Sequence, residues 1–72
     1  MSKGQGESMI KDSLQLRLIE ARRHCGLTQR KVGGVMGVHG ATISSWENGT
    51  REPGVKELKR LASLYNVSLA WL

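Results

Sequence analysis

The chain has 72 residues, and its eleven Lys and Arg residues against six Asp and Glu give a formal net charge of +5 at pH 7. This length allows one domain, close to the lower limit for a self-sufficient core, and the basic balance favours a polyanionic partner. A single Cys excludes an internal disulfide and suits a reducing cytoplasm. Because the sequence has neither an export leader nor a run of about eighteen apolar residues, we expect no membrane association.

The first eleven residues are expected to form a flexible N-terminal arm. They are rich in Gly and Ser and show no hydrophobic periodicity. The folded domain is therefore expected to span residues 12–72.

A first helix is predicted over residues 14–24, with a cap at position 12 or 13. Leu14, Leu18, Ala21 and Cys25 recur with helical spacing and define one apolar face. Arg22 falls on that same face, where a guanidinium needs a partner. Gly26 then ends the helix, and residue 27, a leucine, is expected in the core.

Two short helices around a sharp turn are predicted over residues 28–47, TQRKVGGVMGVHGATISSWE. Thr28 can cap the first helix, on which Val32 and Met36 share one face. Gly37 follows, and a glycine just past a helix end is typical of a left-handed C-cap. The pattern predicts helix-turn-helix geometry.

The second helix of this pair carries Ile43 and Trp46, spaced three apart. With Val38 in the turn and the two apolar residues of the preceding helix, they are expected to form a small apolar cluster. Gly33 stands where the two helices must approach most closely.

A turn is predicted over residues 48–54, which contain Asn-Gly and Pro-Gly. A fourth helix should follow over residues 55–65, with Asn66 as its left-handed cap. Ser68 is expected to cap a fifth helix beginning at residue 69. With no Phe in the chain, Trp46, Tyr65 and Trp71 are the only aromatic side chains for the core.

The motif resembles the helix-turn-helix domains of the lambdoid phage repressor and Cro proteins, the XRE family. The resemblance rests on Gly33, Gly37, Ile43, Trp46 and the Glu-Asn-Gly run at 47–49, and it extends over residues 14–72. It implies an all-α, lambda-repressor-like fold, a compact bundle of five helices. It also implies binding to double-stranded DNA, with the helix at 39–47 in the major groove.

Two groups of DNA-contacting residues are expected. The residues expected to face base edges are His39, Gly40, Ala41, Thr42, Ser44 and Ser45. The residues expected to face phosphates are Thr28, Gln29, Asn48, Thr50, Arg51 and Lys56. For His39 the alternative is a surface-exposed substitute for the usual Ser or Thr cap, and for the phosphate group it is a set of solvated polar side chains.

A structural ion pair is predicted between Arg22 and Glu47. Arg22 lies on the buried face of the first helix, and Glu47 follows the core residue Trp46. Neither charge tolerates burial alone, because desolvation costs several kcal/mol per ion. Some phage repressors carry such a pair at the matching positions.

The resulting hypothesis is a cytoplasmic transcriptional regulator of a bacterial cell. It would be a phage or prophage repressor that binds a two-fold symmetric operator as a homodimer. The dimer would form through residues beyond Leu72 of a longer chain. An antitoxin or a restriction–modification controller of the same fold is the alternative, and a protein-binding adaptor is a third reading. Catalysis is not expected, since no Ser or Cys has both a plausible base and a group to orient it, the carboxylates are scattered along the chain, and no phosphate-binding loop is present. No cofactor is expected, and no metal, because His24, Cys25 and His39 lack zinc-ligand spacing.

Overall fold

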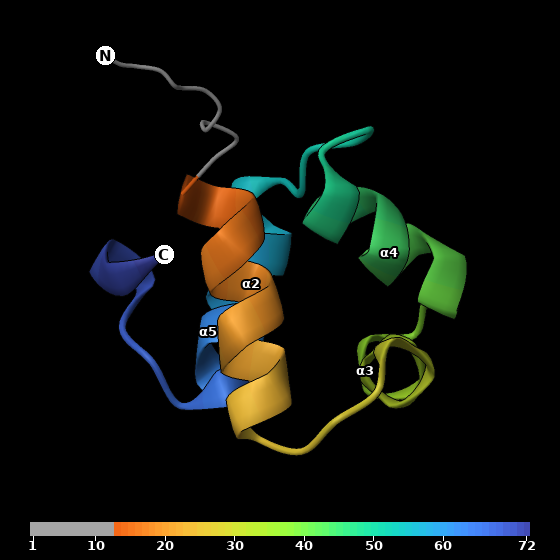
Figure 1. Cartoon of the computed structure of the whole chain (residues 1–72), viewed down its shortest axis with the longest axis horizontal. Helices are drawn as coiled ribbons and strands as arrows, with labels where there is room; N and C mark the ends of the chain where they lie inside the picture. The colour runs from red at the N-terminus through yellow and green to blue at the C-terminus, as the bar shows by residue number, and fades with distance from the viewer. Residues whose placement is uncertain (1–12) are drawn as a thin grey trace, which may run out of the picture.

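Four α-helices and one short 3₁₀ helix make up residues 13–72, the part of the chain that the computed structural model describes. In order they are α2 (Ser13–His24), α3 (Gln29–Met36), α4 (Gly40–Asn48), α5 (Val55–Tyr65) and η1 (Leu69–Trp71). In Figure 1, α5 lies largely behind α2 and α3 is seen nearly end-on, while α4 packs against both α3 and α2. The predicted N-terminal arm and the cap at position 12 lie outside the described residues.

The helix bounds follow local signals in the sequence. Thr28 has an extended backbone, and its hydroxyl accepts a hydrogen bond from Lys31 N, as an N-cap should. Helices α3 and α5 end at left-handed residues, Gly37 with φ of 78° and Asn66 with φ of 59°. Asn is one of the few residues with a side chain that adopt this conformation readily, so its role as the cap of α5 could be predicted from the sequence.

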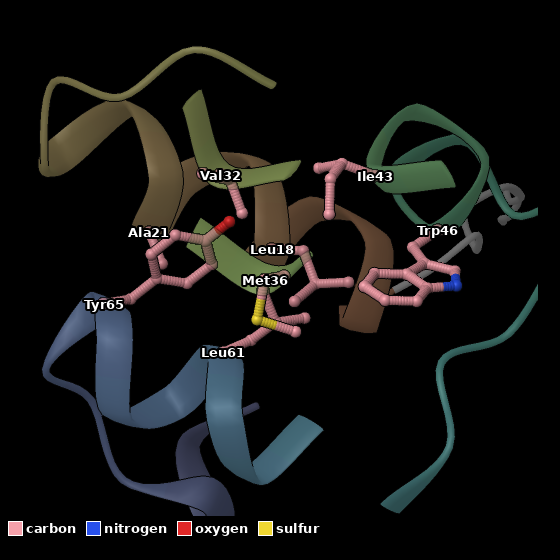
Figure 2. Close-up of a cluster of buried hydrophobic side chains, with 8 residues drawn as sticks. All are labelled: Leu18, Ala21, Val32, Met36, Ile43, Trp46, Leu61 and Tyr65. Carbon is pink, nitrogen blue, oxygen red and sulfur yellow. The ribbon is translucent and has the colours of Figure 1, made fainter. Parts of the chain in front are cut away.

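The core is a single cluster contributed by α2, α3, α4 and α5 (Figure 2). Its members are Leu18, Ala21, Val32, Met36, Ile43, Trp46, Leu61 and Tyr65. In Figure 2, Leu18 and Met36 lie near the middle of the cluster, with Tyr65 on one side and Trp46 on the other. Since these side chains come from four helices, burying them fixes the position of α4.

The predicted fifth α-helix is not confirmed. Ser68 does cap the segment, and its hydroxyl accepts from Trp71 N at 3.1 Å, but residues 69–71 form a 3₁₀ turn. Leu72 N bonds to Leu69 O at 3.1 Å, which is the i→i+3 pattern. A tighter turn of this kind is common in short helical segments.

Several side chains expected in the core are less buried than predicted, although two of them, Leu27 and Val38, still pack against the core cluster. Cys25 is exposed, because α2 ends at His24 and the chain turns away at Gly26 with φ of 71°. Val38 is only half-buried, and Trp71 is 38% exposed. The Arg17 guanidinium lies 5.7 Å from the centre of the Trp71 ring, so this ring covers α2 from outside and makes a cation–π contact.

Candidate nucleic-acid interface

The close approach of α3 and α4 depends on Gly33. A Cβ atom at this position would lie 2.6 Å from Val38 O and 2.9 Å from Gly40 N, so any side chain would force the two helices apart. The turn between them is closed by a hydrogen bond of 2.8 Å from Val38 N to Gly33 O. Gly33 therefore sets the angle at which α4 leaves α3.

The beginnings of α3 and α4 lie next to each other. A Cβ atom on Gly40 would lie 3.2 Å from Arg30 Cα and 3.6 Å from the backbone carbon of Gln29. Gly40 thus lets the first turn of α4 rest on the first turn of α3. The positive ends of two helix dipoles come together at one edge of the domain, a suitable environment for phosphate groups.

The residues expected to read bases lie on α4 or at its N-cap, and one of them, Gly40, faces the first turn of α3. His39 and Ala41 are exposed, and Gly40, Thr42, Ser44 and Ser45 are half-buried. His39 occupies the N-cap position, but its side chain makes no capping hydrogen bond. The core-facing side of α4 is buried and holds Ile43, Trp46 and Glu47.

The ion pair between Arg22 and Glu47 is present and bidentate. Arg22 Nε donates to Glu47 Oε2 at 2.7 Å, and Arg22 Nη2 donates to Glu47 Oε1 at 3.1 Å. The two side chains are only 12% and 4% exposed, and the hydrogen bond to Glu47 raises the pKa of Arg22. Arg22 Nη1 also donates to Leu27 O at 2.9 Å. The pair therefore joins α2, the loop after it and α4.

Gln29 also bonds to Glu47, which the sequence analysis did not anticipate. Its Nε2 donates to Glu47 Oε1 at 3.0 Å. One amide hydrogen and the amide oxygen of Gln29 remain for other partners. The buried carboxylate thus orients the residue that was expected to meet a phosphate.

A compact turn follows α4 and holds the other expected phosphate contacts. Asn48 Oδ1 accepts from Thr50 N at 3.0 Å and from Thr50 Oγ1 at 2.8 Å. Gly49 is left-handed, with φ of 84°, and Arg51 N bonds to Ser45 O at 3.2 Å. The side chains of Arg51 and Lys56 are exposed. The Asn48 oxygen is therefore occupied within the turn, whereas these two cations remain exposed.

Two cations in the first turn of α3 were missed by the sequence analysis. Arg30 and Lys31 are exposed, and the first turn of α3 has no acidic residue. A cation is electrostatically unfavourable at a helix N-terminus, because the helix dipole is positive there. Their position beside Gln29, an expected phosphate contact, was the sequence signal that could have added them to the same group.

Residues 13–72 contain neither a cluster of metal ligands nor a membrane-spanning helix. Among residues 13–72, no three His, Cys, Asp or Glu side chains gather in a way that could hold a metal ion. None of the helices in this part of the chain is long and apolar enough to cross a bilayer.

These features define a helix-turn-helix domain, and the chain belongs to the helix-turn-helix family, whose pattern matches residues 18–72. It is similar to the HTH-type transcriptional regulator ImmR of Bacillus subtilis (strain 168), with 37% identity over 60 residues. The similarity covers 83% of this chain but 47% of that regulator, so the chain spans less than half of its relative's length. No solved structure matches the chain at a significant level.

Proposed function

We propose that this chain is a transcriptional regulator that binds double-stranded DNA in a sequence-specific manner. The observation that carries the proposal is the position of α4, which Gly33 and the buried ion pair hold with a polar side turned outward. An α-helix fits the major groove, where each base pair presents a distinct pattern of donors and acceptors. Membership of the helix-turn-helix family and the similarity to a transcriptional regulator support the same reading.

In this proposal one group of residues contacts base edges and a second group contacts phosphates. Base edges face α4 and its N-cap, through His39, Gly40, Ala41, Thr42, Ser44 and Ser45. Phosphates face the N-terminus of α3, through Thr28 and Gln29, and the turn after α4, through Asn48, Thr50, Arg51 and Lys56. Phosphate contacts fix the register of the protein on the duplex, whereas base contacts carry the sequence preference.

The operator is expected to be two-fold symmetric and bound by a homodimer. One nine-residue helix touches only a few base pairs, too few to define a site among the many competing sequences of a genome. Two half-sites with centres about 34 Å apart would place both reading helices on the same side of the duplex. Within this class we favour a repressor of the phage or prophage type.

The proposal is tested by selecting bound sites from random duplex DNA and then measuring affinity for the selected site over a range of salt concentrations. We expect a defined sequence and an affinity that falls steeply with salt, because bound counterions are released. Failure to select any sequence, or an affinity insensitive to salt, would overturn the proposal and favour a protein-binding adaptor.

A charge-matched pair of variants assigns the phosphate contacts. Arg51→Ala is expected to weaken binding to all sequences about equally and to reduce the slope of log affinity against log salt by about 0.9 for each bound subunit. Arg23→Ala is the control: it removes the same charge from an exposed position at the end of α2, outside both groups. Equal effects of the two variants would mean that Arg51 acts only through net charge.

A further inference from the structure

The hydroxyl group of Ser45 has a defined orientation. Ser45 Oγ lies 2.7 Å from Thr42 O, the carbonyl one turn earlier in α4. A carbonyl oxygen can only accept a hydrogen bond, so the hydroxyl proton of Ser45 points back into its own helix. A hydroxyl has one proton and two lone pairs, and the lone pairs are what Ser45 has left to present to a ligand.

The surrounding residues do not supply another hydrogen-bond donor to the lone pairs of Ser45. Within residues 13–72 no other group donates to Ser45 Oγ. Ala41, one turn earlier on the same side of α4, offers only a methyl group. Helix α4 contains no Lys or Arg, so it has no cation to donate to the acceptors of guanine.

We infer that Ser45 is an acceptor-only reader, which selects an amino base over a keto base on the DNA strand that it faces. The inference rests on the proposed function and names the chemistry of one contact within it. In the major groove, adenine N6 and cytosine N4 are donors that can bond to the Ser45 lone pairs, whereas thymine O4 and guanine O6 are acceptors that repel them. The operator position opposite Ser45 is therefore adenine or cytosine.

The position is identified by selecting operators with the parent chain and with Ser45→Ala. It is the base pair at which the preference weakens in the variant. We expect the parent to select adenine or cytosine there, on one strand of each half-site. Guanine or thymine on that strand, lost in Ser45→Ala, would mean that the hydroxyl proton turns to the DNA, and would overturn the inference.

A base analogue then tests the contact itself. The adenine at that position is replaced by purine, which lacks the N6 amino group, or the cytosine by 2-pyrimidinone, which lacks the N4 amino group. For one lost hydrogen bond we expect the parent affinity to fall about 2- to 10-fold. Ser45→Ala should bind natural and analogue DNA equally, whereas Arg23→Ala, with Ser45 intact, should lose affinity as the parent does.

The outcomes separate this inference from the proposed function. If the parent selects an operator but the analogue weakens parent and Ser45→Ala equally, the chain reads DNA and Ser45 does not make this contact. If the parent selects no sequence at all, the proposed function fails and the inference fails with it.

Discussion

At the scale of single residues, the two adjacent glycines of α3 have opposite environments. A Cβ atom on Gly33 would lie 2.6 Å from Val38 O, whereas a Cβ atom on Gly34 would meet no atom within 4 Å. We expect Gly33→Ala to destabilise the domain, because α3 and α4 would have to separate. We expect Gly34→Ala to stabilise it by up to about 1 kcal/mol, since alanine favours a helix interior over glycine.

Urea denaturation of the two glycine variants measures this difference. Both substitutions add one methyl group to the same helix, so each is a control for the other. Equal changes in the free energy of unfolding would show that Gly33 is not a point of close approach. The sequence predicted the role of Gly33 through its place in the motif, and Gly34 lies between the buried Val32 and Met36 at a surface position, which agrees with the open space around it.

Tyr65 gives the domain a pH-dependent stability at alkaline pH. Burial, helped by the nearby Glu47 charge, raises the pKa of Tyr65 from 10.0 to about 12. Because the folded pKa is above the unfolded value, the stabilisation is complete below pH 10 and is lost as the pH rises towards 12. We expect the free energy of unfolding to fall between pH 10 and pH 12. In Tyr65→Phe the part of this fall that comes from ionisation of Tyr65 should be absent.

Ultraviolet absorbance can follow this titration directly, since Tyr65 is the only tyrosine in the chain. The folded protein should form tyrosinate about two pH units later than the urea-unfolded chain. Titration of the folded protein near pH 10 would contradict the burial of this hydroxyl.

At the scale of helices, the boundaries were largely predictable because their signals are local. Thr28, Gly37 and Asn66 act on their own backbone or on residues one turn away, and the structure places all three at helix ends. The exposure of Cys25 and Trp71 was not predictable from periodicity, because it depends on where the chain turns after each helix. The last segment is a 3₁₀ turn, and helical periodicity does not distinguish this from the start of an α-helix.

The contact between α2 and α4 through Arg22 and Glu47 should be strongly coupled. Both side chains are nearly buried, so removing one leaves the other charge without compensation. We expect Arg22→Met or Glu47→Leu alone to cost about 3–5 kcal/mol, and the double variant to cost much less than the sum. Chemical denaturation of the four proteins in this cycle measures the coupling.

Arg23→Met is the control for that cycle, because it makes the same change at the next, exposed position of α2. It should shift the free energy of unfolding by no more than about 0.5 kcal/mol. Additive losses at Arg22 and Glu47 would mean that the ion pair contributes nothing of its own. The pair was predictable because a lone arginine on an apolar helix face requires a partner. The additional bond from Gln29 was not, because it requires the distances between side chains.

At the scale of the whole molecule, the chain holds one short polar helix in a fixed orientation. Gly33 and Gly40 bring the beginnings of α3 and α4 together, and Glu47 ties the end of α4 to α2. Of the residues predicted for the outward side of α4, His39 and Ala41 are exposed, whereas Gly40 packs against α3. The sequence could not indicate that Gln29 bonds to Glu47 or that the first turn of α4 rests on the first turn of α3. Those features arise only when the helices are assembled.

The most direct test of the central claim, that α4 reads base edges, is operator selection with Ala41→Gln beside the parent chain. Ala41 is exposed on the outward side of α4, so the longer amide should leave the core intact and offer new hydrogen bonds to the major groove. We predict that the variant folds as the parent does and selects a different base, with a preference for adenine, at one position of each half-site. Selection of the same sequence with unchanged preference at every position would contradict the claim.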